Sequence, residues 1–314
     1  MIYRIKKVNG NIVELGDPIY VKINVSIDAP ASDLVAIFNF NDETYEIRNI
    51  YVYDDTTMVF NGMVDEQKVE CGPNGTFLTI SARNKAGMLV DNEAEPQVYD
   101  KPSLSTIFRR HIAPYGFIAY YGDDTAFASE FVVSKGMTEW GVLKKFCNTF
   151  LDSEPYVVGN DGINAANGPV TQYNFITLSN SGKRTRYTSI KKTIKRYGVI
   201  SKIKIKTANA SGYTTEIIDE SATQRGIVKT KYYNYTNGIQ SISEYGDSII
   251  KDSKKDQCTF DVECVGSVYL ELGAMVNIND DIFGEVTGLK LTKIKYILDS
   301  SGETTQLTMR MEEM

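Results

Sequence analysis

Alternating apolar and polar residues dominate the first hundred positions and predict antiparallel strands. In YVKINVSID (20–28), one face is formed by the apolar side chains of Val21, Ile23, Val25 and Ile27. This pattern is typical of a strand with one buried face. Similar segments predict strands at 47–53, 58–64 and 76–82, and the pair Asn74-Gly75 predicts a hairpin turn before the last of them. Short, evenly spaced strands with Asn, Asp and Gly between them indicate a barrel or sandwich.

The apolar spacing lengthens in the middle of the chain and predicts two helices. Ser103 is placed to cap a first helix, which Pro114 and Gly116 end. Its apolar side chains are Leu104, Ile107, Phe108 and Ile112. A second helix is expected from Thr138, with a buried stripe of Trp140, Leu143, Phe146, Cys147 and Phe150. The segment GNDGINAANG (159–168) is expected to be a loop of turns.

Strand patterns return in the last third, at 201–207, 258–264 and 306–311. Residues 242–255 have helical spacing, although Gly246 weakens that prediction.

A faint internal repeat links the two β regions. VFNGMV (59–64) and FLTISA (77–82) resemble IFGEV (282–286) and QLTMRM (306–311), and each pair encloses a hairpin glycine. We expect Met58–Val64 to overlay Asp281–Val286, and Phe77–Ala82 to overlay Gln306–Met311. Two unrelated β regions are the alternative interpretation.

Length and composition describe an ordinary globular chain. The 314 residues fit two or three modules, and 42% hydrophobic with 24% charged residues predict little disorder. The formal net charge of -6 argues against general binding to a nucleic-acid backbone. There is no run of about 18 apolar residues and no secretory signal at the start, so we expect a protein made and assembled in a cytoplasm.

Candidate catalytic groups are few. The single histidine, His111, lies on the apolar stripe of the first predicted helix and is interpreted as a partly buried, hydrogen-bonded side chain. One histidine is too few for an HExxH or multi-histidine zinc site. The sequence has no GxSxG, GxxxxGK[ST] or GxGxxG motif. We therefore predict that the chain is not an enzyme and has no catalytic, cofactor-binding or metal-binding residues and no cofactor.

Cysteines and carboxylates have structural interpretations. Cys71, Cys147, Cys258 and Cys264 are expected to be small core or surface residues. The last two share one strand face about 20 Å apart, too far for a disulfide bond or a shared metal ion. The pairs Asp123-Asp124 and Asp280-Asp281 lie in turn-like segments, and forty acidic residues produce such pairs by chance. NINDD (277–281) lacks the DxDxDG pattern of a calcium loop, so a β-turn is expected there.

The basic stretch 183–206 could bind phosphates. However, Lys202, Lys204 and Lys206 share one strand face opposite Ile203 and Ile205. That arrangement favours a solvated or protein-facing surface over a nucleic-acid site. The twenty tyrosines fit a protein interface and a sugar-binding site equally.

Three longer segments carry a resemblance to a known family. LTISARNKAGMLVDNEAEPQVYDKPSLSTIFRRHIAPYGF (78–117) combines a strand, a turn of small residues and arginine, the LVDN sequence, an acidic-proline segment and a helix ending near PYGF. GMTEW (136–140) begins the second helix, and GAMVNINDDIFGEVTGLKLTKIKYILDSSGETTQLTMRM (273–311) closes the chain. In kind and order these segments resemble the baseplate hub family of contractile-tailed phages and R-type bacteriocins. That family includes late-control-D-type and Mu-like hubs and is related to the N-terminal part of VgrG.

The resemblance implies a mainly β fold with two tube-like antiparallel β-barrel domains and a helical insertion. The expected domains are a first barrel at 1–98, a middle helical or α/β module at 99–187, and a second barrel with a short helical insertion at 188–314. The implied protein is a structural virion component and a homotrimer. Its six barrels form a pseudo-sixfold ring that joins the sixfold tail tube protein to the threefold central spike protein.

Further implied partners are the C-terminus of the tape-measure protein and neighbouring baseplate proteins, with no membrane and no sequence-specific nucleic acid. The helices should lie outside the ring, the lumen wall should be polar and not strongly basic, and the lysine row at 202–206 should point outward or into a subunit contact. Because the chain ends after the closing β segment, no fused spike or lysozyme domain is expected.

The expected location is the baseplate of a phage tail or phage-tail-like particle, such as a tailocin, assembled in the bacterial cytoplasm. The Lys, Ile, Asn and Tyr content favours a low-GC Gram-positive source. The alternative function is a β-rich carbohydrate-binding tail-tip adhesin, which the middle helices and the repeat disfavour. A cell-wall hydrolase is a third class.

Overall fold

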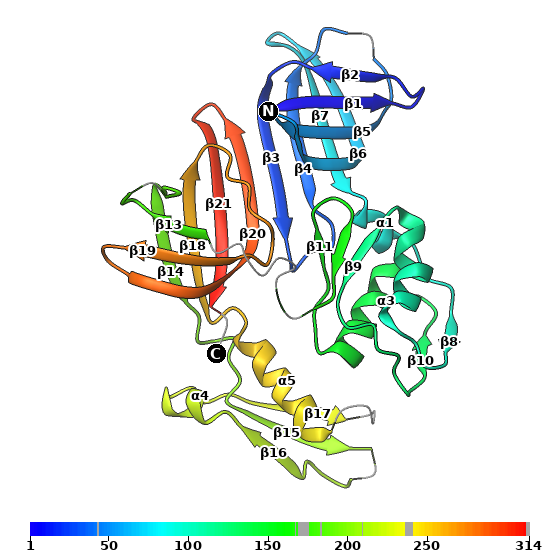
Figure 1. The fold of residues 1–314 in the computed structure, drawn as a ribbon, viewed down its shortest axis with the longest axis vertical. Coiled ribbons are helices and arrows are strands. Elements are labelled where there is room, and N and C mark those ends of the chain that lie inside the picture. The colour runs from blue at the N-terminus through cyan, green and yellow to red at the C-terminus, as the bar shows by residue number, and fades with distance from the viewer. Residues whose placement is uncertain are drawn as a thin grey trace.

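A computed structural model describes residues 1–42, 44–166, 168, 176–182, 184–208, 210–235 and 241–311. The chain is mainly β, with two large β units, a helical module and a small α/β module (Figure 1). The expected fold class is confirmed. None of the helices in the described segments is both long and apolar enough to span a bilayer.

The first β unit is built on alternating strands, as the sequence predicts. Its strands are β1 (Ile2–Lys7), β2 (Ile12–Leu15), β3 (Pro18–Ser26), β4 (Asp33–Asn39), β5 (Ile47–Asp54), β6 (Thr57–Gly72) and β7 (Gly75–Asn84). On β3, Val21 and Ile23 enter a core shared with Leu34 and Phe38 of β4. The first part of β6 pairs with β5 and the second part with β7. Strands β5, β1 and β2 therefore cross over the layer of β3, β4 and β7 (Figure 1).

The helical module follows β7 and has a separate core. Its elements are α1 (Ala86–Asp91), β8 (Gln97–Tyr99), α2 (Leu104–Ile107), the π-helix η1 (Phe108–Ile112), the 3-10 helix η2 (Ala113–Tyr115), β9 (Ala119–Tyr121), β10 (Phe131–Val133), α3 (Glu139–Phe146), the π-helix η3 (Cys147–Leu151), β11 (Tyr156–Val158) and β12 (Gly162–Asn164). The predicted caps are confirmed: Ser103 accepts from the Thr106 amide and Thr138 accepts from the Gly141 amide.

One expectation for this module is wrong. Residues 159–168 do not form only a loop, because β12 pairs antiparallel with β11 and parallel with β9. Ile163 of β12 and Ala165, which follows the strand, belong to the module's core. A three-residue strand that begins with Gly162 and ends with Asn164 is too short to show an alternating pattern. Asn167 lies outside the described residues.

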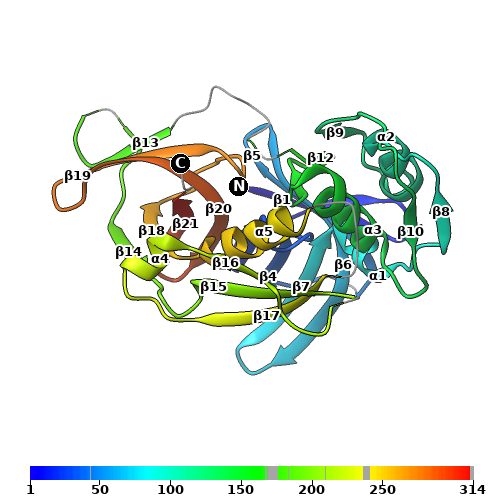
Figure 2. The same ribbon diagram turned by 90° about the horizontal axis from the view of Figure 1, so that it is seen from below.

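The second β unit comprises β13 (Ile176–Ser179), β14 (Ser189–Ile194), β18 (Cys258–Val265), β19 (Met275–Asp280), β20 (Gly284–Asp299) and β21 (Gly302–Met311). Between β14 and β18 the chain forms a small α/β module. Its elements are β15 (Lys202–Thr207), β16 (Thr215–Ile218), α4 (Glu220–Gln224), β17 (Thr230–Tyr235) and α5 (Ile242–Lys254). Helix α5 packs on one face of the sheet of β15–β17 (Figures 1 and 2), and this small module lies below the two β units in the view of Figure 1. The predicted helix at 242–255 is confirmed.

Core and sheet membership assign the elements that lie near the ends of these units. Helix α1 and strand β8 belong to the helical module, although the expected first barrel extends to residue 98. Strand β13 pairs with β19 of the second β unit, although the expected middle module extends to residue 187. A four-residue strand paired with a strand a hundred residues later leaves no local signal.

The two β units repeat one strand arrangement. The first has the order β3-β4-β7-β6-β5 and the second β14-β18-β21-β20-β19, with every neighbouring pair antiparallel. Strands β6 and β20 each have 16 residues, and β7 and β21 each have 10. The units differ at the next strand, since β1 runs antiparallel to β5 whereas β13 runs parallel to β19.

The ladder registers give a residue-level correspondence. Gly72 faces Gly75 in the first hairpin and Asp299 faces Gly302 in the second, an offset of 227 residues. The β-bulge after Val64 matches the bulge after Leu291 at the same offset. Bulges are specific local features, so this coincidence supports a true internal duplication. The overlay expected from the sequence motifs is wrong, because Phe77–Ala82 corresponds to residues 304–309, two positions earlier than expected.

Candidate assembly surface

The two β units are joined edge to edge within one sheet. The second part of β20 pairs antiparallel with β3, from Lys293 opposite Ser26 to Leu298 opposite Val21. The result is a continuous run of eight strands in the order β14-β18-β21-β20-β3-β4-β7-β6. Its apolar side chains point into the cores of the two units.

The opposite face of this eight-stranded run is polar and carries both signs of charge. On the first unit it includes Lys22, Asn24, Asp33, Glu66, Lys68, Glu70, Thr79, Ser81 and Arg83, which alternate with buried or half-buried positions. On the second unit it includes Lys191, Asp261, Glu263, Lys293, Lys295, Gln306, Thr308 and Arg310. Several of these side chains bond one another across strands: Asn24 donates to Asp33 at 2.6 Å and Thr308 donates to Asp261 at 2.7 Å. A face of this kind is hydrated without being a general anion site.

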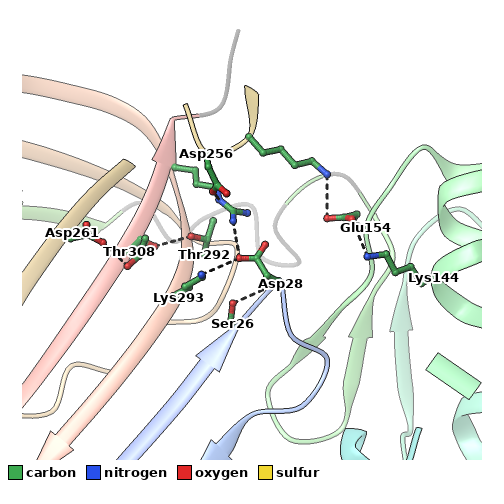
Figure 3. A network of polar contacts seen from close by, with 11 residues as sticks. Ser26, Asp28, Lys144, Glu154, Asp256, Asp261, Thr292, Lys293 and Thr308 are labelled. Atoms are coloured by element: carbon green, nitrogen blue, oxygen red, sulfur yellow. Dashed lines mark hydrogen bonds and ion pairs between the residues drawn. The ribbon is translucent and has the colours of Figure 1, made fainter. Parts of the chain in front are cut away.

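A charged network lies where the β20–β3 ladder ends (Figure 3). Arg310 donates to Asp28 and to Asp256, each at 2.7 Å, and Lys293 lies 3.4 Å from Asp28. Burial disfavours the Asp28 carboxylate, but hydrogen bonding and the charges of Arg310 and Lys293 outweigh it, so the pKa of Asp28 lies below its usual value. The network joins β3, β21 and the segment that leads from α5 to β18.

A second contact in the same region joins the helical module to the rest of the chain. Glu154 lies between Lys144 at 3.3 Å and Lys255 at 3.2 Å (Figure 3). Close by in sequence, Tyr156 and Val158 of β11 pack with Leu272 and with Ile294 of β20. The helical module is therefore packed against the sheet junction.

His111 is buried in a hydrogen-bonded cluster, as expected. It lies 2.5 Å from Glu139 through Nδ1 and 2.8 Å from the Tyr99 hydroxyl through Nε2. An ionised carboxylate can only accept, so Nδ1 carries the hydrogen and donates to Glu139. Tyr115 also donates to Glu139 at 3.3 Å. These bonds hold the π-helical turn η1 against the first turn of α3.

The carboxylates considered in the sequence make turns, as expected. Asp123 accepts from the Thr125 amide at 2.9 Å, and Asp124 accepts from the Ser105 amide at 2.6 Å. The β-turn expected at 277–281 is displaced: residues 277–280 belong to strand β19, and the turn follows at 281–283, where Asp280 accepts from the amides of Ile282 and Phe283. Across the described part of the chain, no three His, Cys, Asp or Glu side chains are grouped to hold a metal ion.

The cysteines are free thiols, and two of the basic residues form ion pairs on the surface of the small sheet. All four cysteines are free thiols; Cys147 and Cys264 are buried and Cys71 is exposed. Lys202 and Lys204 both pair with Glu216, at 2.7 and 3.3 Å, on the face of the small sheet opposite α5. Lys183 lies outside the described residues. Sequence reasoning missed the junction between β20 and β3, because pairing between strands so far apart in the chain leaves no local pattern.

No protein-family model matches this chain, and a search of the curated proteins finds no match. Solved structures do match over its full length. A tail protein from Neisseria meningitidis has a TM-score of 0.79 at 16% identity, covering 98% of this chain and 96% of that one. The prophage MuSo2 43 kDa tail protein from Shewanella oneidensis has a TM-score of 0.78 at 14% identity, covering 98% and 97%.

A component of the type VI secretion system of Escherichia coli is also similar, with a TM-score of 0.59 at 8% identity, covering 95% of this chain and 74% of that chain. At these identities the likeness is one of fold. The chain therefore has the fold of phage tail proteins and of a type VI secretion component, which confirms at the level of fold the resemblance seen in the sequence.

Proposed function

We propose that this chain is the structural baseplate hub of a contractile tail, a trimeric adaptor between the sixfold tail tube and the threefold central spike. The observation that carries the proposal is the internal duplication, with two copies of one β unit joined in one sheet. Three such chains offer six similar units to a sixfold tube and three identical chains to a threefold spike. Duplication thereby reconciles two symmetries in a closed ring.

The proposal is supported by the names of the full-length structural neighbours, which are tail proteins. In the proposed ring the polar face of the eight-stranded run lines the lumen. Its mixed charge suits that position, since a strongly basic wall would retain the phosphates of passing DNA. The tape-measure C-terminus and neighbouring baseplate proteins complete the proposed set of partners, and assembly takes place in the bacterial cytoplasm.

We also propose that the chain acts without catalysis and that its domains follow the cores: 1–84, 86–165, and 176–194 with 258–311, the small α/β module at 200–254 being an insertion. A hub transmits force through interfaces, so its work needs shape and stability and no reacting side chain. Purified protein should therefore leave peptidoglycan intact in a zymogram.

A cryo-electron microscopy map of the tail that carries this chain tests the proposal. We expect three copies on the tail axis, between the last tube ring and the spike. A different copy number on the axis would contradict the adaptor role. A position at the periphery, with glycan binding by the purified chain, would instead support a tail-tip adhesin.

A further inference from the structure

The junction between the two β units shows how one unit joins another. The edge of β20 at residues 293–298 pairs with the edge of β3 at residues 21–26. By the duplication, β20 corresponds to β6 and β3 corresponds to β14. Within the described residues, the matching parts of β6 and β14 are paired on one side only, with β7 and with β18. One chain thus contains one completed junction and the two halves of another.

We infer that the free edge of β6 pairs with the free edge of β14 in a second copy of this chain. The inference rests on the proposed trimer and names the contact that closes it. Because the two edges differ, the contact is head to tail and closes a ring. Each copy then adds its eight strands to one continuous sheet.

The duplication also fixes the register of this contact. Ala36 and Val262 are equivalent, because they face Ile80 and Leu307 at the common offset. Val21 faces Ala36 and Ile190 faces Val262, so Val21 corresponds to Ile190. Leu298 opposite Val21 therefore becomes Cys71 opposite Ile190 of the next copy.

Continuing along the ladder gives Glu70 opposite Lys191, Lys68 opposite Thr193 and Glu66 opposite Lys195. The register thus places two acidic side chains directly across from two basic ones. Opposite charges in directly facing positions stabilise strand pairs. Nothing in the duplication argument uses charge, so the match is independent support for the pairing.

The side chains on the free edges of β6 and β14 are more exposed than their counterparts at the β20–β3 junction, as expected for edges that a partner strand covers. At the completed junction Tyr296 and Ile23 are 6% and 5% exposed. Their counterparts at the free edges are Val69, which is half-buried, and Lys192, which is exposed. Ile194 at the end of β14 is 60% exposed. A soluble protein normally blunts such edges or pairs them.

A single substitution tests the register, because Cys71 is already an exposed free thiol. Under mild oxidation, Ile190→Cys should give covalent multimers that end at the trimer. Adding Cys71→Ser should abolish them. Lys192→Cys, two residues along the same strand, should yield at least about tenfold less covalent trimer, since a diagonal neighbour is about 7–8 Å away.

Charge reversal is the second test and leaves the core untouched. Glu70 lies 2.7 Å from Lys68 on its own exposed edge, so folding should tolerate its replacement. Glu70→Lys should weaken each contact roughly fivefold in sedimentation equilibrium, and Glu70→Lys with Lys191→Glu should restore it. The control pair, Glu70→Lys with Lys251→Glu, should not.

Oxidation traps even transient contacts, so the absence of Cys71-dependent multimers across a concentration series overturns this pairing. If the protein forms a trimer that neither the cysteine substitutions nor the charge reversals affect, the edge contact is wrong and the hub proposal still stands. Covalent trimers of Ile190→Cys in a chain that lies off the tail axis would support the pairing and contradict the hub.

Discussion

The guanidinium of Arg310 donates to the carboxylate of Asp28 over 2.7 Å, although the two residues are 282 positions apart. The contact fixes the end of the ladder between β20 and β3. Its counterpart in the duplication is Arg83, which donates to Asp65 at 2.7 Å and to Asp91 at 2.7 Å. Each β unit therefore ends its last strand in an arginine held by two aspartates, but only Arg310 reaches across to the other unit.

We expect Asp28→Asn to lower the free energy of unfolding at neutral pH. The Asp28 pKa is depressed in the folded chain, from a usual value of 3.8. Its contribution is therefore fully present above that value and is lost as the pH falls through the lower, folded pKa. In urea titrations, wild type and variant should differ by a constant amount above about pH 5 and converge below pH 3.8.

Glu130→Gln, at an exposed carboxylate, is the matched control and should follow the wild type at every pH. A gap between wild type and Asp28→Asn that persists unchanged to low pH would show that Asp28 acts through packing and not through its charge.

The duplication was visible in the sequence only through motifs that do not superpose. The Leu-Thr pairs in FLTISA and QLTMRM suggested the repeat, yet Leu78 corresponds to Thr305 and Leu307 corresponds to Ile80. What the two units share is alternation, hairpin length and bulge position. These features constrain the backbone and leave the identity of each buried apolar residue open.

Local signals in the sequence predicted the two helix starts and several of the alternating strands, whereas elements held by distant partners were missed. Ser103 and Thr138 identified both helix starts because a cap depends on the next three residues. Strands β12 and β13 were missed because each is short and is held by a distant partner. The candidate assembly surface could not be found from sequence, since a free edge differs from a paired one in its neighbours and not in its own pattern.

Trp140 should be a core residue of the helical module. It is 8% exposed and packs in the cluster with Leu143 and Phe146, whereas the predicted stripe residue Phe150 is only partly buried there. We expect Trp140→Ala to cost about 3–5 kcal/mol in thermal or urea unfolding. The control Val98→Ala, at a 60% exposed position of the same module, should cost far less. Unchanged stability with loss of assembly alone would mean that Trp140 serves a partner.

Gly246 weakened the helix prediction, and the structure gives the reason for a glycine there. A Cβ at this position would lie 2.2 Å from Cδ1 of Ile217 and 2.8 Å from Cδ1 of Ile203. The glycine lets α5 lie close to its sheet. Gly246→Val should therefore destabilise the chain by about 1–3 kcal/mol through overpacking.

Lys251→Val controls for the β-branched side chain, because Lys251 is exposed on the same helix. It should lower the free energy of unfolding by only a few tenths of a kcal/mol, because valine has a lower helix propensity than lysine. Equal effects of the two substitutions, read by circular dichroism during unfolding, would contradict close packing of α5.

Gly273 is the point where the second β unit meets the helical module. It has a φ of +81°, and a Cβ there would lie 2.2 Å from the hydroxyl oxygen of Tyr156. That hydroxyl also accepts from the Asn164 side chain at 2.7 Å, so it cannot move without breaking a buried hydrogen bond. Gly273→Ala combines backbone strain of about 1–2 kcal/mol with a clash that separates two modules.

Gly284→Ala isolates the strain, because Gly284 has a φ of +68° and open space where the Cβ would lie. Gly273→Ala should therefore be the more destabilising of the two by about 1–3 kcal/mol. It should also make the helical module unfold separately, so that tryptophan fluorescence from Trp140 and far-ultraviolet circular dichroism give different midpoints. Coincident transitions with equal losses in both variants would show that the contact between Gly273 and Tyr156 does not couple the modules.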